Sequence, residues 1–334
     1  MPKKIKWLTI LSAIILLTGF LGYFNREALA MRGFDWLLSG HVEKELEKSF
    51  KPLEGREPLQ LGDQYKNADP FSLLLLGVDQ RDQERGRSDT MIYTVVRPKD
   101  GAILMVSIPR DTYVDIAGRD RSDKITHAYA FGGAKMALET VEGLFDRPIQ
   151  HYASINFQGF RDVIDAMGGI SLPIEEDLVN DDTDHEKFVV PAGQDLYNGT
   201  DALNYVRYRE DAGGDMNRTG RHQVFLNAML DRASSVGQWA KIPGLMETMG
   251  NNFTTDMPPS MIVGLAQSFL QQNTRIIHSH TLQGEGRRKH SGGAWYYFAK
   301  EEDLEKTKAL IDSWMDGEIQ QEALPLPDED SAAE

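Results

Sequence analysis

The first long hydrophobic segment of the chain is an uncharged run over residues 7–24, preceded by lysines at positions 3, 4 and 6. At 1.5 Å per residue, a helix of this length nearly crosses a hydrocarbon core of about 30 Å. The lysines should stay in the cytoplasm by the positive-inside rule. The pattern therefore predicts a cytoplasmic N-terminus over 1–6, a transmembrane signal anchor over 7–24 and a chain that continues outside the cytoplasm.

Two other interpretations of this segment remain open. Ala28-Leu29-Ala30 resembles a signal-peptidase site, so the segment could be removed after Ala30. The run could also be a buried core helix. Arg26 and Glu27, together with the length of the run, favour an uncleaved anchor.

Three strands are predicted after a polar linker with a short helical pattern over 25–66. Residues 71–78 form a continuous apolar run, which is typical of a buried strand. Residues 90–96 are β-branched and apolar, and residues 102–108 follow a Pro-Lys-Asp-Gly turn at 98–101. We expect these strands to form an antiparallel meander.

Helical periodicity recurs through the rest of the chain. Thr200 and Asn217 are expected to cap two of the helices, and residues 170–174 are predicted to form a short strand between an earlier helix and an acidic loop at 175–188. The helical segments are predicted at 34–52, 134–145, 157–167, 200–205, 217–233, 258–272 and 301–315. Mixed strands and helices in one stretch indicate a single α/β/α domain over 67–316. The acidic tail over 317–334 is predicted to be disordered.

Composition narrows the function. Asp and Glu outnumber Lys and Arg by 51 to 36, which gives a formal charge of −15. This balance argues against broad nucleic-acid binding, which needs a basic surface. The absence of cysteine excludes disulfides, thiolate metal sites, iron–sulfur clusters and a cysteine nucleophile.

The predicted meander brings several charges to one edge of the sheet. The first strand ends at Asp79, the second begins near Asp89, and the third runs back to Arg110 and Asp111. The intervening loop adds Arg81, Arg85 and Arg87. Carboxylates suit a hard cation such as Mg²⁺, and arginine forks suit phosphate. The edge therefore predicts a metal–diphosphate site; the alternative is a set of exposed, mutually paired surface charges.

A second basic cluster occurs over 205–221. Arg207 and Arg209 would share a face in extended backbone but not on a helix. Asp215, Arg218 and Arg221 lie on roughly one side at the start of a helix, whose N-terminus favours an anion. The alternative is a loop of solvated arginines. His127 and His222 are both expected to be packed or hydrogen-bonding residues; the alternative is that they contact a ligand or act as a base.

Six ordered motifs carry a resemblance to a known family. They are LLLLGVD (73–79), RSDTM (87–91), SIPRDT (107–112), DKITHAYAFGG (123–133), NGTDALNYVRYR (198–209) and DMNRTGRHQ (215–223). With the anchor and the extracellular domain, the chain resembles the LytR-CpsA-Psr family, and is most similar to the teichoic-acid ligases of Gram-positive bacteria.

The resemblance implies an α/β/α sandwich around a mixed sheet, with an apolar tunnel for a polyprenyl chain and the diphosphate at its mouth. It implies a phosphotransferase that moves a phosphoglycan from undecaprenyl diphosphate to the C6 hydroxyl of N-acetylmuramic acid in peptidoglycan, with Mg²⁺ or Mn²⁺ as cofactor. The partners would be the lipid-linked polymer, peptidoglycan and the membrane, with no nucleic acid. The identity of the polymer stays open.

The resemblance also implies roles for single residues. Asp79 and Asp89 would hold the metal, Asp111 and Asp215 would orient the arginines, and Arg221 and Gln223 would line the site. The diphosphate-binding arginines would be Arg87, Arg110, Arg207, Arg209 and Arg218. Catalysis would rest on Arg110, Asp111 and Asp89, mainly by positioning and charge neutralisation. One carboxylate could act as general base. His222 stands where many members have glutamine, in a supporting position.

The alternative is a non-catalytic polyprenyl-phosphate- or glycan-binding protein, or a regulator of the attenuator type. Simple diphosphate hydrolysis, with water in place of the sugar acceptor, is a third possibility. Phosphotransfer to peptidoglycan in vitro would separate these functions.

Overall fold

The computed structural model describes residues 39–56, 68–79, 86–181, 187–208, 214–234, 250–271, 276–290 and 292–327. The anchor predicted over 7–24 lies outside these residues. Within the described ranges, every helix is too short or too polar to cross a bilayer.

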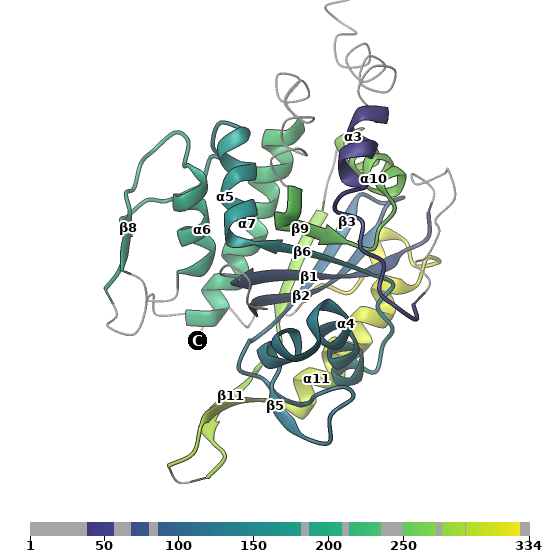
Figure 1. Cartoon of the computed structure of the whole chain (residues 1–334), viewed down its shortest axis with the longest axis vertical. Coiled ribbons are helices and arrows are strands. Elements are labelled where there is room, and N and C mark those ends of the chain that lie inside the picture. Colours follow the sequence, from purple (N-terminus) through teal and green to yellow (C-terminus); the bar gives the residue numbers. More distant parts are fainter. Residues whose placement is uncertain are drawn as a thin grey trace, which may run out of the picture.

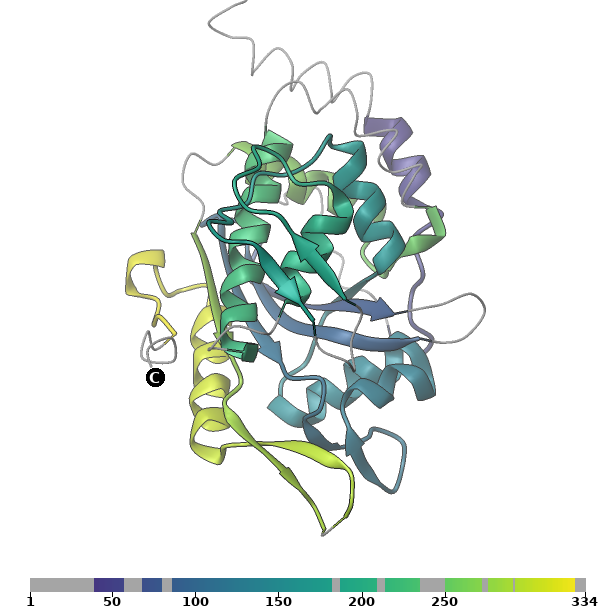
Figure 2. The ribbon, with the colours of Figure 1, turned by 90° about the vertical axis from the view of Figure 1, so that its left-hand side faces the viewer.

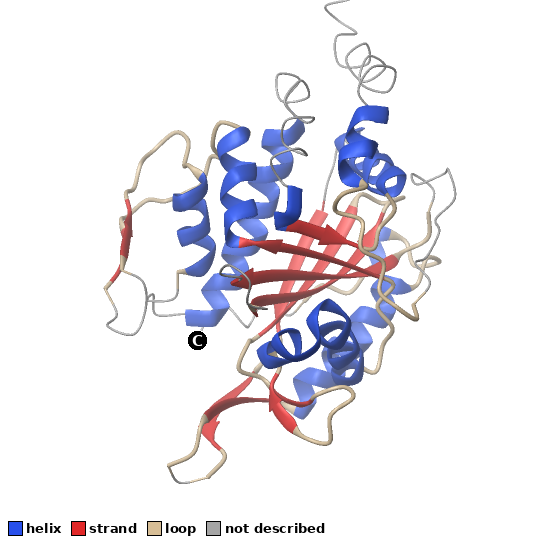
Figure 3. Ribbon diagram, in the orientation of Figure 1, coloured by secondary structure: helices blue, strands red, loops and turns tan. Residues whose placement is uncertain are grey.

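A six-stranded mixed sheet forms the middle layer (Figures 1 and 3). The predicted meander is confirmed, because β1 (Phe71–Asp79), β2 (Arg87–Arg97) and β3 (Ala102–Ile108) pair antiparallel in chain order. β6 (His151–Asn156) extends the sheet parallel to β1, and β10 (Ile276–Thr281) extends it parallel to β3. β9 (Phe253–Thr255) pairs antiparallel with β6 at the edge.

Alternation along β1 builds two separate cores. Leu74, Leu76 and Val78 point to one face, where α4 (Thr126–Phe145) and α11 (Glu301–Met315) cover them. Leu73 belongs to the opposite face, which packs against α10 (Pro259–Gln271). The molecule is therefore the α/β/α sandwich that the sequence predicts.

A helical lobe stands beside the second face. It is built from α5 (Phe157–Ala166), α6 (Gly199–Arg207) and α7 (Gly214–Ser234), and it has its own apolar core. The lobe meets the sheet through Leu226 and Leu230 of α7, which pack on β2, β3 and β10. The lobe and the sheet thus face each other across a shared apolar boundary.

Several element boundaries differ from the predictions. α4 begins at Thr126 because the chain continues through a kink at Gly133 (φ 67°, ψ −157°), a conformation that glycine adopts without strain. α6 is capped by Asn198, whose side chain accepts a hydrogen bond from the N–H of Asp201, and not by Thr200. α7 begins at Gly214, so Asn217 lies inside the helix.

Other predicted segments also differ: one predicted strand is absent, and short strands occur where none was predicted. Residues 170–174 contain a single bridge from Ile170 to Tyr197 instead of a strand. The acidic loop holds a small hairpin of β7 (Leu178–Asn180) and β8 (Phe188–Val190). Two further hairpins are β4 (Tyr113–Asp115) with β5 (Ser122–Lys124), and β11 (Gly284–Arg288) with β12 (Trp295–Ala299).

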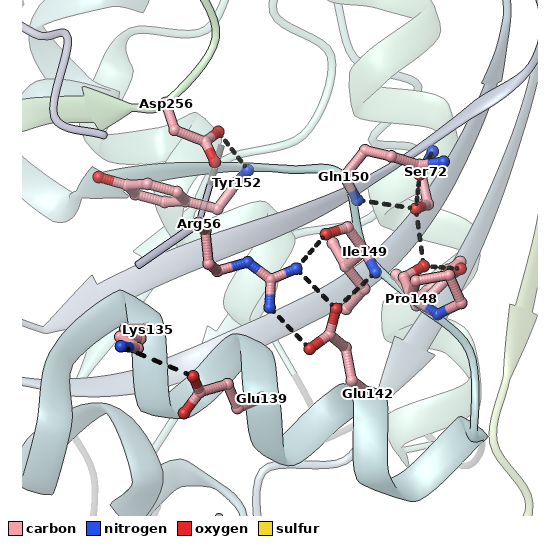
Figure 4. A network of polar contacts seen from close by, with 11 residues as sticks. Arg56, Ser72, Lys135, Glu139, Glu142, Pro148, Ile149, Gln150, Tyr152 and Asp256 are labelled. Carbon is pink, nitrogen blue, oxygen red and sulfur yellow. Dashed lines mark hydrogen bonds and ion pairs between the residues drawn. The ribbon is translucent and has the colours of Figure 1, made fainter. Parts of the chain in front are cut away.

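The folded part of the chain begins before the boundary predicted at residue 67. α3 (Ser39–Leu46) buries Leu46 against Val263 of α10. Further on, Arg56 forms a bidentate ion pair with Glu142 of α4, at 2.9 and 2.8 Å, and also donates to the carbonyl of Ile149 (Figure 4). These contacts fix residues 39–56 to the domain, although their sequence is that of a linker.

The start of the acidic tail is ordered, which corrects the prediction of disorder from residue 317. The side chain of Arg97 is 3% exposed and donates to the carbonyls of Trp314, Asp316 and Ile319, at 2.8, 2.8 and 2.6 Å. Trp314 Nε1 donates to the carbonyl of Pro325 at 2.9 Å. The order of this segment depends on hydrogen bonds from Arg97, more than 200 residues earlier in the chain. The local composition of the tail therefore does not predict it.

Candidate functional site

An irregularity in the sheet produces the charged edge. Gly77 of β1 pairs with Thr90, but the next residue, Val78, pairs with Ser88. Asp89 is therefore an extra residue on β2, a β-bulge of the kind often found beside functional sites. Asp79 ends β1 opposite Arg87. The two predicted metal ligands thus come from the same end of neighbouring strands.

Arg110 lies between two carboxylates. Its Nη1 donates to Asp89 Oδ1 at 2.9 Å, and its Nε lies 3.8 Å from Asp111 Oδ2. All three side chains are partly exposed, between 23% and 32%. The backbone carbonyl of Arg110 accepts the N–H of Thr126 at the start of α4. The guanidinium is therefore held in place while remaining open to a ligand.

Lys124 joins this group, although the sequence reasoning did not single it out. Its Nζ donates to Asp111 Oδ1 at 2.6 Å. Next to it, Asp123 accepts from the N–H of Lys124 and lies 3.0 Å from His127 Nδ1. Burial alone would raise the pKa of Asp123, but these hydrogen bonds outweigh it and leave the pKa below its usual value. The only sequence indication of these two residues is the DKITH motif, in which two charges stand just before a helix.

An apolar cavity of about 330 Å³ runs between the sheet and the helical lobe. Gly77 and Thr90 form part of its wall, and they stand two residues before Asp79 and one after Asp89. Glycine is required at position 77 by close packing, because a Cβ there would lie 3.0 Å from Thr90 Cβ. The further lining side chains include Leu75, Ile92, Met105, Phe157, Phe160, Val163, Leu203, Val206, Phe225, Leu226 and Met229.

Arg207 of the second basic cluster and His222, just after it, line this cavity. Arg207 ends α6, and its guanidinium lies 4.7 Å from the centre of the Phe157 ring. His222 lies on α7 and is 8% exposed, so it is packed into the wall. Arg207 is helical, which excludes the extended backbone that would align it with Arg209.

The other predicted site residues of this region are Arg209, Asp215, Arg218, Arg221 and Gln223. Arg221 donates to the carbonyl of Tyr208 at 3.1 Å and lies over the Tyr208 ring, which braces the end of α6. Gln223 donates to the carbonyl of Ile277 and accepts from Ser279 Oγ at 2.8 Å, so its amide is committed to β10. Arg209 and the side chains of Asp215 and Arg218 lie outside the described residues.

The oxygen donors of the charged edge suit a magnesium ion whose coordination is completed by a phosphate substrate. In the part of the chain that the structure describes, no group of three or more His, Asp or Glu side chains could hold a metal ion. The charged edge contributes two carboxylates, Asp79 and Asp89. Magnesium in phosphoryl-transfer sites commonly takes one or two carboxylates and completes its octahedron with phosphate and water oxygens. Two carboxylates beside arginines meet that requirement.

Comparisons with known proteins identify the family. The LytR_cpsA_psr family model matches residues 37–312. A relative from Bacillus subtilis (strain 168), the polyisoprenyl-teichoic acid–peptidoglycan teichoic acid transferase TagU, is 37% identical over 247 residues, which is 73% of this chain and 78% of that protein.

Solved structures show the same fold. The crystal structure of Bacillus subtilis TagV superimposes with a TM-score of 0.62 at 31% identity and covers 74% of this chain and 97% of that one. A structure described as TagT bound to LIIa-WTA gives a TM-score of 0.64 at 28% identity, with 79% and 98% covered.

Proposed function

Because this chain belongs to the LytR-CpsA-Psr family, we propose that it is a membrane-anchored phosphotransferase of the cell envelope. In this proposal it moves a phosphoglycan, wall teichoic acid, from undecaprenyl diphosphate to the C6 hydroxyl of N-acetylmuramic acid in peptidoglycan. The acceptor oxygen forms a bond to the glycan-bearing phosphorus, the bond from that phosphorus to the bridging oxygen breaks, and undecaprenyl phosphate leaves.

The observation that carries the proposal is the apolar cavity that borders the charged edge. A substrate with a long apolar chain and a diphosphate needs both environments, joined at one place. Gly77 and Thr90 line the cavity, and the same strands carry Asp79 and Asp89 immediately beyond it. The polyprenyl chain would occupy the cavity, and its diphosphate would meet the arginines at the mouth.

The residues at the mouth would act by charge and position. Arg110 presents a fork that matches two phosphate oxygens, and its contacts with Asp89 and Asp111 fix the orientation of that fork. Arg207 would meet the diphosphate from the other wall. A bound Mg²⁺, held by Asp79 and Asp89, would supply further neutralisation of phosphate charge.

The acceptor proton needs a base beside the site. Asp111 lies beside Arg110 and is not one of the two carboxylates that would hold the metal, so it could take the hydroxyl proton as the new bond forms. Asp111 is also bonded to Lys124, which holds its carboxylate in place. We therefore assign the base to Asp111.

The proposal is tested by reconstitution. Purified protein is incubated with an undecaprenyl-diphosphate-linked glycopolymer and peptidoglycan oligomers, with Mg²⁺ or with EDTA. The expected products are a polymer–peptidoglycan phosphodiester and undecaprenyl phosphate. An acceptor that lacks the C6 hydroxyl should give neither. Donor binding without turnover would instead favour a lipid- or glycan-binding protein, and release of lipid phosphate without an acceptor would indicate hydrolysis.

A further inference from the structure

The hairpin of β11 and β12 projects from the domain at the end opposite to α3 (Figures 1 and 2). It forms a two-stranded sheet of its own. Arg287, Arg288 and Lys289 are all exposed, and the neighbouring acid in β11 is Glu285. In a chain with a net charge of −15, this hairpin is a local concentration of positive charge.

Aromatic rings hold two of these cations in place. Arg287 lies 3.9 Å from the centre of the Phe298 ring. Lys289 donates to the hydroxyl of Tyr113 and lies 4.4 Å from the centre of that ring. Tyr113 in turn contacts Tyr296 and Phe298, with ring centres 5.0 and 5.3 Å apart. We name Tyr113, Arg287, Lys289, Tyr296 and Phe298 the hairpin cluster; its charges are positioned before any ligand arrives.

The hairpin also presents an open aromatic plane. The indole of Trp295 is 51% exposed. It lies on the backbone of β11, because a Cβ at Gly286 would come within 2.8 Å of its Nε1. Glycine thus lets the ring lie flat while one side stays open to solvent. A large exposed aromatic on a projecting element is typical of an interaction surface.

The hairpin is continuous with the candidate site. The N–H of Tyr297 donates to the carbonyl of Asp111 at 2.9 Å, and Tyr297 forms a β-bridge with Thr112. Lys124, which is bonded to the Asp111 carboxylate, also lies 6.0 Å from the centre of the Tyr296 ring. A series of side-chain contacts therefore leads from Arg110 through Asp111 and Lys124 to the hairpin cluster.

From this placement we propose that the hairpin binds the phosphodiester-linked glycopolymer of the donor, beyond the diphosphate. This inference rests on the proposed function. Arg287 and Lys289 contact successive phosphates, and Trp295 packs against a sugar or polyol unit. Charge complementarity favours a polyanion over a neutral glycan strand.

The binding test uses soluble teichoic-acid polymer, freed of lipid and peptidoglycan, with the full chain in detergent. In isothermal titration at low salt, Arg287→Gln with Lys289→Gln should weaken binding about tenfold. Lys48→Gln with Lys187→Gln removes the same charge from exposed lysines elsewhere and should leave binding unchanged. Trp295→Ala is a second variant and should also weaken binding, with folding verified by circular dichroism.

A kinetic test separates this inference from the proposed function. With donors that carry a long polymer, the double variant should show a raised KM and an unchanged kcat. With donors that carry a single repeat, it should match the wild type. Polymer binding without any transfer would overturn the proposed function and leave the hairpin inference intact. Unchanged polymer affinity in the double variant would overturn the inference, as would a loss confined to glycan strands or to anionic vesicles.

Discussion

At the scale of single residues, the candidate site depends on how its charges constrain one another. Arg110 is fixed by Asp89 and Asp111, and Asp111 is fixed in turn by Lys124. Partly exposed pairs of this kind contribute little to folding stability. Their value is geometric, because a guanidinium that is already oriented loses less conformational freedom when it binds phosphate.

Replacement of Arg110 by lysine tests whether geometry matters beyond charge. Lysine keeps the positive charge but loses the planar fork. We expect Arg110→Lys to lower transfer about a hundredfold, similar to the loss of one preorganised donor in other active sites. Arg147→Lys, at an ion pair with Asp312 away from the site, is the matched control. Near-normal transfer by Arg110→Lys would show that charge alone is sufficient.

Asp303 gives a pH-dependent prediction. Burial raises the pKa of this carboxyl, but the hydrogen bonds with His280 and with the N–H of Gln283 lower it by more than burial raises it. The folded-state pKa therefore lies below the usual value. The folded state then binds this proton more weakly than the unfolded state. The stabilisation is present above the unfolded pKa of about 3.9 and disappears as the pH falls through the folded one.

Asp303→Asn should therefore lower the free energy of unfolding near neutral pH by about 1 kcal/mol. The difference from wild type should narrow as the pH falls from about 5 toward 3. Urea unfolding at a series of pH values measures it. A difference that stays constant across that range would assign the stabilisation to packing instead of charge.

At the scale of elements, Arg97 joins the end of β2 to the end of α11 and to the tail. Its removal leaves the carbonyls of Trp314, Asp316 and Ile319 without this donor. Arg97→Met should lower the free energy of unfolding by about 3–5 kcal/mol. Hydrogen exchange should increase at residues 317–325 in particular. Arg147→Met, which breaks an exposed pair, should cost less than about 1 kcal/mol.

The sequence predicts elements well where one local pattern dominates. β1, β2 and β3 are continuous apolar runs and were predicted with their pairing. β6 was missed because the residues HYASIN mix polar and apolar side chains, and their burial comes from the sheet on both sides. The start of α4 was missed because Gly132-Gly133 is typical of a break, whereas the helix continues through a kink.

The candidate site divides in the same way. Asp79, Asp89, Arg110 and Asp111 could be brought together from the strand order alone. Lys124 could not, since it reaches Asp111 through a small hairpin with few residues of regular pattern. The cavity could not be predicted from the sequence either, because the residues that line it and the residues of the core are both apolar.

At the scale of the whole molecule, the cavity lies between the sheet and the helical lobe, where a bound lipid would contact both. Undecaprenyl phosphate at a hundred times its Kd should stabilise the protein by about 2.7 kcal/mol and raise its Tm. Val163→Phe places a larger side chain in the cavity wall and should abolish that shift. Val179→Phe, at an exposed position in β7, should retain it. An equal shift in all three proteins would place the lipid elsewhere.

The predicted topology is also a property of the whole chain. If residues 7–24 span the membrane, a reporter fused after Glu334 should be active only outside the cytoplasm. Activity inside the cell would contradict the anchor. A mature protein that begins at Met31 would show that the segment is cleaved.

The irregular pairing beside Gly77 determines which changes of chain length this protein can accept. Deletion of Asp89 would let β2 pair with β1 in continuous register, so the sheet should still form. The same deletion would keep Ser88 opposite Val78 and Arg87 opposite Asp79, and would remove a carboxylate from the edge. The extra residue in β2 is thus needed for the chemistry of the edge and not for formation of the sheet, and insertions should be tolerated between Asp79 and Arg87, where they leave that register intact.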